Sequence, residues 1–278
     1  MRRILLGLSL CLALAISSGP ALAWGDRGHS IVAELAQRHL TPKAADAVRE
    51  LLAGASMAGV ASWADDYKFR PEGSSTQAWH FIDIDVAKAT YSEDDCKGAC
   101  LVSALRLESA ILSDPHRHEA EHRQALMMLI HLVGDSTQPF HCAERDNDSG
   151  ANLVPVTLAI NGPDGKPLPV VQTNLHAIWD DALINAHVYS WGVYADDLET
   201  RLFAGLPAPT IYGDWAATWV DECHVVAQRL YKMTPAPAAG ASVNIGTDYQ
   251  KAVQQTIDLQ LATGGARLAA LLNHLLGE

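Results

Sequence analysis

The sequence predicts a mainly α-helical fold with one short β-hairpin. In most of the long segments, apolar residues recur at helical spacing, and only one stretch has the strand–turn–strand pattern of a hairpin. Hydrophobic residues make up 49% of the 278 residues, which is enough for one sizeable core. No internal repeat is visible, and nothing marks a second domain.

Four helices are expected in the first half of the chain, over residues 30–40, 41–54, 99–114 and 122–139. The second of them has clear start signals, because Thr41 is a good N-cap and Pro42 suits the first helical position. The fourth should stop near Pro139, since proline breaks a helix.

The hairpin is expected where residues 152–160 and 167–173 flank the turn sequence NGPDGK. Helix returns over 174–187. After a loop rich in Pro, Ala and Gly at 234–242, the C-terminal part is helical from 248–265 to 266–276.

The first 23 residues have the pattern of a secretory signal peptide. Arg2 and Arg3 precede an apolar run over 4–16, and Ala21-Leu22-Ala23 offers small residues at the cleavage positions. The alternative is a membrane anchor, but the run is shorter than the roughly 20 residues that span a bilayer. We therefore expect an exported, periplasmic or secreted chain of one domain, 24–278, whose first residue is Trp24.

Four cysteines remain after cleavage, and an even number in an exported chain predicts two disulfides. Cys96 and Cys100 are close enough to clip one loop, and Cys142 would then pair with Cys223 over a long span. The alternative is that some of the four bind metal as thiolates.

The net charge is −12, and it becomes −14 without Arg2 and Arg3. Such an acidic chain should not attract nucleic acid through a basic patch. A polyanionic substrate would have to be held by something else that is positive.

Histidine and aspartate recur at metal-ligand spacing. In HLVGD, His131 and Asp135 are four residues apart and share a helix face, and His176 and Asp180 repeat this in HAIWD. His141 follows just past the first of these helices. One such pair alone is more often a surface hydrogen bond, but two pairs with a third histidine indicate metal sites of imidazole and carboxylate ligands.

Three further segments supply more candidate ligands. Asp65 lies in SWADD, His80 lies in AWHFID, and His29 lies in WGDRGH together with the new amino terminus at Trp24. Their joint occurrence strengthens the prediction of several metal sites.

These motifs together resemble the trinuclear-zinc, single-strand-specific nucleases of the S-one/P-one type, to which mung bean nuclease belongs. The similarity runs from Trp24 to the C-terminal TIDLQLATGGARLA. It is carried by WGxxGH, ASWADxxK, HFID, HxxGDxxQPxH and NLHxxWD. The resemblance implies a mainly α-helical, single-domain fold, which zinc-dependent phospholipase C shares.

The resemblance also implies three Zn²⁺ ions and their ligands. Asp135 would bridge the first two ions. The first would be bound by Asp65, His80, His131 and Asp135; the second by His29, Asp135 and the amino nitrogen and carbonyl oxygen of Trp24; the third by His141, His176 and Asp180. Signal removal would then create a ligand, because an amide nitrogen binds zinc poorly.

The remaining site residues follow from the same resemblance. Asp65 would orient the attacking hydroxide, and Lys68 would neutralise charge on the phosphoryl oxygens. Phe81 would stack on a base and Asp83 would hydrogen-bond its edge, while Asn152 would lie near the scissile phosphate.

Three of these roles have an alternative. Lys68 could be an ordinary surface lysine, Phe81 a core residue, and Asp83 a partner that orients a ligating histidine. The sequence also departs from the family pattern. The loop CAERDNDSGA is longer than in the fungal enzymes, and Cys142 directly follows a ligand.

We therefore expect a zinc-dependent endonuclease that cuts single-stranded DNA and RNA to 5′-phosphorylated products and also acts as a 3′-nucleotidase. One alternative is a phospholipase C, but those relatives end their last motif in HxxxE, whereas this chain has HxxxD at His176 to Asp180. The other alternative is a periplasmic zinc-binding protein without catalysis.

Overall fold

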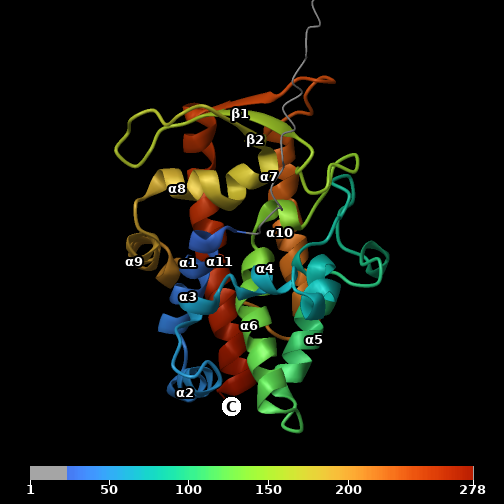
Figure 1. Ribbon diagram of the computed structural model, residues 1–278, viewed down its shortest axis with the longest axis vertical. Coiled ribbons are helices and arrows are strands. Elements are labelled where there is room, and N and C mark those ends of the chain that lie inside the picture. Colours follow the sequence, from blue (N-terminus) through green and yellow to red (C-terminus); the bar gives the residue numbers. More distant parts are fainter. Residues whose placement is uncertain (1–23, 278) are drawn as a thin grey trace, which may run out of the picture.

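The computed structural model describes residues 24–277. The predicted signal peptide, residues 1–23, lies outside this range. Helices α1, α6 and α11 pack against one another in the middle of the molecule (Figure 1). A small sheet lies at one end of these helices, at the top of Figure 1, and the C-terminus lies at the other end.

Helices dominate the described chain, as predicted. The longer ones are α1 (Asp26–Arg38), α2 (Pro42–Leu51), α5 (Leu101–Ser113), α6 (Glu119–Asp135), α9 (Trp191–Arg201), α10 (Trp215–Met233) and α11 (Thr247–Leu276). Short helices are α3 (Met57–Val60), α4 (Trp63–Tyr67), α7 (Leu175–Ala177) and α8 (Leu183–His187). Four 3-10 helices of the described chain are η1 (Pro71–His80), η2 (Glu93–Asp95), η3 (Pro139–His141) and η5 (Phe203–Gly205), and η4 (Ile178–Ala182) is a π-helical turn.

Most predicted helices are confirmed with shifted ends. Thr41 caps α2 by accepting from the backbone N–H of Ala44, and Pro42 is the first helical residue. The two predicted C-terminal segments form one helix, α11. Helices α9 and α10 were not predicted. The buried residues of α10 include Trp219, Cys223 and Leu230, which recur on one helix face.

The hairpin is confirmed, and a third strand joins it. Strand β1 (Pro155–Ala159) pairs antiparallel with β2 (Val171–Asn174), with Leu158 opposite Val171. Strand β3 (Val243–Gly246) pairs parallel with the other edge of β1. This strand was not predicted, because its four residues follow a loop without strand signals.

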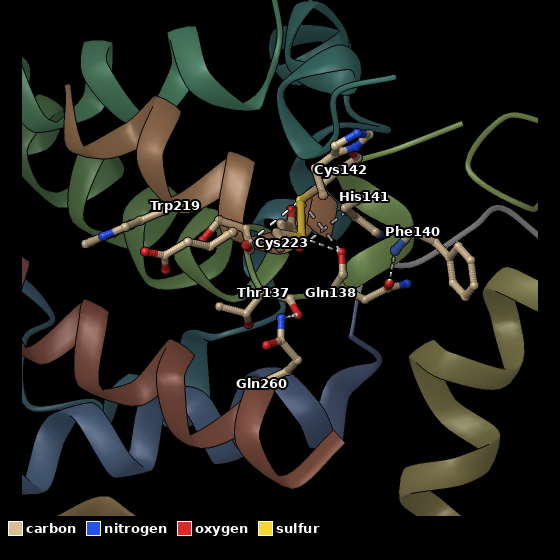
Figure 2. The surroundings of a disulfide bond; sticks show 12 residues. Thr137, Gln138, Phe140, His141, Cys142, Trp219, Cys223 and Gln260 are labelled. Carbon is tan, nitrogen blue, oxygen red and sulfur yellow. Dashed lines mark hydrogen bonds and ion pairs between the residues drawn. A yellow bond between two sulfur atoms is a disulfide. The ribbon is translucent and has the colours of Figure 1, made fainter. Parts of the chain in front are cut away.

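Both predicted disulfides are present. Cys96–Cys100 closes a loop of sequence separation 4, and Cys142–Cys223 joins segments 81 residues apart. Figure 2 shows that the second bond ties α10 to the segment that follows η3 and His141. The alternative that some of these four cysteines bind metal as thiolates is therefore wrong. Within residues 24–277, no helix combines the length and apolar character that crossing a membrane requires.

Candidate metal centre

Three groups of buried histidine and aspartate side chains lie together in the interior. Within each group, the potential ligand atoms all lie within 4.8 Å of one another. The groups are His29, His131 and Asp135; Asp65, His80 and His131; and His141, His176 and Asp180. All eight histidine and aspartate side chains that were predicted as ligands are therefore brought together.

These side chains come from seven different elements. Helix α6 supplies His131 and Asp135 from its last two turns. Gly134, between them, is required because a Cβ atom there would lie 2.7 Å from Nδ1 of His29, on α1. The other ligands lie on α4 (Asp65), η1 (His80), η3 (His141), α7 (His176) and η4 (Asp180).

A π-helical turn places the last group. His176 lies on α7 and Asp180 on the π turn η4 that follows it, with His176 Nε2 3.4 Å from Asp180 Oδ2. Such turns occur mostly as single insertions and are frequent at functional sites. Asp180 is also held by Gln138, whose Nε2 donates to its Oδ1 at 2.5 Å. Gln138 lies in the motif HxxGDxxQPxH, but no role was predicted for it.

Backbone carbonyls orient three of the histidines. In each, Nδ1 donates to a carbonyl oxygen, so that Nε2 points into the group. The pairs are His131 with Ala61 at 2.8 Å, His141 with His80 at 2.5 Å, and His176 with Gly150 at 2.5 Å. His80 is turned the other way, since its Nδ1 lies 3.1 Å from Asp135 Oδ2.

The groups fit metal ions because their polar atoms are not otherwise satisfied. Both ring nitrogens of His29 and Oδ1 of Asp135 are buried without a hydrogen-bond partner among residues 24–277, although His29 Nε2 lies 3.3 Å from that oxygen. In the third group, the Nε2 atoms of His141 and His176 face each other at 3.1 Å. Imidazole nitrogens and carboxylate oxygens are suitable zinc ligands.

The pKa values also bear on metal binding. Burial, and then the charge of His141, lowers the pKa of His176 to about 3, so this ring is neutral and able to bind metal. Burial lowers the pKa of His131, but the carboxylates of Asp135 and Asp65 outweigh it and raise the value to about 9. A cation must therefore displace a proton from His131, which makes its binding weaker as the pH falls.

Lys68 is buried beside this centre. Its side chain is 8% exposed, and its Nζ lies 2.5 Å from Oδ1 of Asp65. Burial opposes ionisation of Asp65, but the charges of His131 and Lys68 prevail and hold its pKa well below the usual range. The alternative that Lys68 is an ordinary surface lysine is wrong.

A cleft of about 450 Å³ opens above the centre. It is lined by several predicted site residues, namely Lys68, His80, Phe81, Asp83, His141, Asn152 and His176. Phe81 is 39% exposed there, so the alternative that it is a core residue is wrong. Phe81 and Asp83 line the cleft while Ile82 and Ile84 are buried, as the alternation of an extended chain requires.

Sequence reasoning missed other residues of the cleft. Phe69 is 58% exposed and lines it directly after Lys68. Gln77, Ser149 and Gly150 also line it. The turn-forming sequence NDSGAN was a signal for a loop at this place, but nothing in the sequence around Phe69 or Gln77 marked them.

Trp24 lies at the start of α1, close to the third group. Its side chain is fully buried, and its indole Nε1 donates to Thr137 Oγ1 at 3.2 Å. The next residue, Gly25, donates its backbone N–H to the carbonyl oxygen of Asp180 at 2.8 Å. Metal binding by the backbone of Trp24 stays a prediction.

A helical protein with buried histidine and aspartate groups beneath a cleft has the architecture of a metal-dependent hydrolase. The sequence model described as S1/P1 Nuclease matches residues 24–277, so the chain belongs to the S1/P1 nuclease family. Nuclease P1 of Penicillium citrinum is 30% identical, with 92% of this chain and 98% of that protein covered. Endonuclease 3 of Arabidopsis thaliana is 29% identical, with 92% and 90% covered.

Family membership confirms the resemblance and the enzyme class. The chain is a nuclease, a hydrolase of phosphodiester bonds. The alternative of a zinc-binding protein without catalysis is thereby set aside.

Proposed function

We propose that this nuclease is a zinc-dependent endonuclease that cuts single-stranded DNA and RNA to 5′-phosphorylated products, and that it also acts as a 3′-nucleotidase. One observation carries the proposal. The buried histidine and aspartate groups lie directly beneath a cleft that has a buried lysine at its floor and an exposed aromatic ring in its wall.

We assign one zinc ion to each group, with His131, which belongs to two of the groups, assigned to the first ion. Asp65, His80, His131 and Asp135 would hold the first; His29, Asp135 and the amino nitrogen and carbonyl oxygen of Trp24 the second; His141, His176 and Asp180 the third. The orientation of Asp135 supports a bridging role, since its Oδ1 faces His29 at 3.3 Å and its Oδ2 faces His80 at 3.1 Å.

When bound, zinc supplies Lewis-acid chemistry at the phosphodiester. Asp65 stays ionised at neutral pH and accepts a hydrogen bond from the attacking water, which it thereby orients. Lys68 is held by Asp65, so its ammonium group is fixed before substrate arrives. It stabilises the negative charge that grows on the phosphoryl oxygens in the transition state.

The cleft wall would hold the nucleotide. Phe81 offers a ring face on which any base can stack, which suits an enzyme that is not sequence-specific. The carboxylate of Asp83 would accept hydrogen bonds from the base edge, and Asn152 would contact the backbone near the scissile phosphate. Because the chain has a net charge of −12, the metal centre and Lys68 would supply most of the attraction for a polyanion.

Export would complete the site. Residues 1–23 would be removed as a signal peptide, and the catalytic domain would be 24–278, starting with the free amino group of Trp24. Two disulfides support an oxidising compartment, either the periplasm or the exterior.

The test uses purified protein that begins at Trp24. It should cleave single-stranded DNA and RNA, lose this activity with a chelator, and regain it with zinc. Asp135→Asn should lose metal and activity, whereas His116→Ala, at an exposed histidine, should retain both. Hydrolysis of phosphatidylcholine in preference to nucleic acid would favour the phospholipase C alternative, and activity that resists chelation would contradict the proposal.

A further inference from the structure

The loop over residues 145–152 forms one wall of the cleft and has an unusual backbone. Five residues in it have positive φ, a conformation that non-glycine residues adopt at a cost. They are Asp146 at 55°, Asn147 at 58°, Ser149 at 54°, Gly150 at 58° and Ala151 at 65°. Ser149 and Ala151 in particular have no preference for this conformation, so hydrogen bonds made by the folded loop must stabilise it.

Asp148 supplies these contacts from inside the loop. Its side chain is 9% exposed, and its Oδ1 accepts hydrogen bonds from the backbone N–H groups of Arg145 at 3.1 Å and Ala151 at 3.0 Å. The same oxygen accepts from the hydroxyl of Tyr231 at 2.8 Å. One carboxylate oxygen thus closes the loop and attaches it to the end of α10.

Arg145 strengthens this attachment. Its guanidinium group lies over the ring of Tyr231, 4.6 Å from the ring centroid. Its Nη1 donates to the carbonyl oxygens of Tyr231 at 3.1 Å and Thr234 at 2.9 Å, where α10 ends. Helix α10 is itself tied by the Cys142–Cys223 disulfide to the segment that carries His141 (Figure 2).

The loop in turn orients a predicted metal ligand. The carbonyl oxygen of Gly150 accepts from Nδ1 of His176 at 2.5 Å, which directs Nε2 of that ring toward His141 and Asp180. A side chain at Gly150 would place Cβ 2.3 Å from the carbonyl oxygen of Phe140, so the loop also packs closely on η3. A shift of the loop would therefore move the hydrogen-bond acceptor that fixes His176.

We propose that Asp148, with Tyr231, is a positioning residue for the third metal site, because it fixes the loop that orients His176. This inference rests on the proposed zinc-dependent function. Asp148 is not itself a predicted ligand. Its Oδ2 has no hydrogen-bond partner within residues 24–277, so the geometry of Oδ1 is the feature that matters.

The test compares metal binding by Asp148→Ala, Asp148→Asn and Tyr231→Phe with that of the unaltered protein starting at Trp24. Zinc stoichiometry and affinity are measured by competition with a chromophoric chelator, and folding by circular dichroism. Loss of a group that orients a ligand weakens metal binding by about 10- to 100-fold. Asp148→Ala should show this loss for one zinc of three. Asp148→Asn keeps the acceptor Oδ1 and should restore affinity, and Tyr231→Phe should fall between them.

A matched control separates positioning from general destabilisation. Asp258, in α11, is also a buried aspartate that accepts a hydrogen bond from a tyrosine, Tyr194, at 2.5 Å, but it lies outside the metal groups. Asp258→Ala should melt at a lower temperature and still bind three zinc ions. If Asp148→Ala fails to fold, Tyr231→Phe still tests the positioning role, because it removes only one of the three hydrogen bonds that Asp148 Oδ1 accepts.

Two different failures can be told apart. If the unaltered protein binds three zinc ions and Asp148→Ala and Tyr231→Phe bind them equally tightly, the positioning role is wrong and the proposed function stands. If the unaltered protein binds no zinc, the proposed function fails and this inference fails with it.

Discussion

Nζ of Lys68 lies 2.5 Å from Oδ1 of Asp65; both side chains are buried, and Lys68 lines the cleft. A buried lysine is stable only when it is paired, so this contact fixes the position of the ammonium group. It also joins the two residues to which we assign roles in the phosphodiester reaction.

Lys68→Met should lower kcat by much more than it raises KM, because the ammonium group helps to bind the phosphate but acts mainly on charge that develops in the transition state. Removing one such group costs about 10²- to 10³-fold in kcat. Steady-state rates on a short single-stranded oligonucleotide measure this. Lys166→Met, at a side chain that is 81% exposed, is the control and should leave both constants unchanged. A kcat for Lys68→Met within about threefold of the unaltered enzyme would contradict the role.

Substrate binding should depend only weakly on salt. If Lys68 is the main basic contact, the logarithm of the affinity should fall with the logarithm of salt concentration with a slope of about −0.7 for a single strand. Fluorescence anisotropy with a phosphorothioate oligonucleotide measures the slope. A value of about −4 or steeper, as expected for six or more basic contacts, would show that the protein has a basic surface that we have not identified.

Stability should fall with rising pH because of Glu108 in α5. Burial raises the pKa of Glu108 to about 7 from 4.5. The folded protein therefore keeps this proton between these values while the unfolded chain loses it, and the free energy of unfolding decreases as the pH rises through this window. At about 1.4 kcal/mol per unit, Glu108→Gln should be about 3 kcal/mol more stable than the unaltered protein at about pH 8.

Urea unfolding at about pH 5 and about pH 8 measures this effect, which should be much smaller at the lower pH. Glu119→Gln, at an exposed position, should show no such pH-dependent gain. An equal effect of Glu108→Gln at both pH values would mean that ionisation of Glu108 does not determine the difference.

Ala151→Gly should stabilise the protein, because Ala151 has a φ of 65° that glycine adopts without a steric penalty. The steric cost of about 1–2 kcal/mol is partly offset by the greater freedom of glycine in the unfolded chain, so we expect a gain of about 0.5–1 kcal/mol. Ala47→Gly, inside α2, should instead lose about 1 kcal/mol. Urea midpoints of the two variants should move in opposite directions, and a loss in both would refute the strain at Ala151.

The sequence predicted the local features of the fold well. The helical spacing in α1, α2, α5 and α6 and the turn NGPDGK were sufficient, because these signals are contained within each segment. Helix α10 has the same apolar periodicity, although it was not predicted. Strand β3 depends on pairing with β1, which its four residues do not reveal.

In the candidate site, too, features contained within one segment were predicted and features that depend on tertiary contacts were not. The HxxxD pairs at His131 and His176 are visible because both partners lie on one helical segment. The burial of Lys68 and the positive φ angles of Ser149 and Ala151 were not visible, because tertiary contacts impose them on residues that have no such preference. Gln138 and Tyr231 act on the site through partners that are 42 and 83 residues away in sequence.

Zinc analysis of two forms of the protein tests the metal centre most directly. One form begins with Trp24, and the other retains a methionine before it, which moves the amino group by one residue. We expect three zinc ions and full activity in the first form. The second should hold about two and lose most activity, because paired metal ions act together on the phosphodiester. Trp24→Ala with the correct start should keep metal better than the extended form. Three zinc ions and full activity in the extended form would show that the amino terminus is not a ligand.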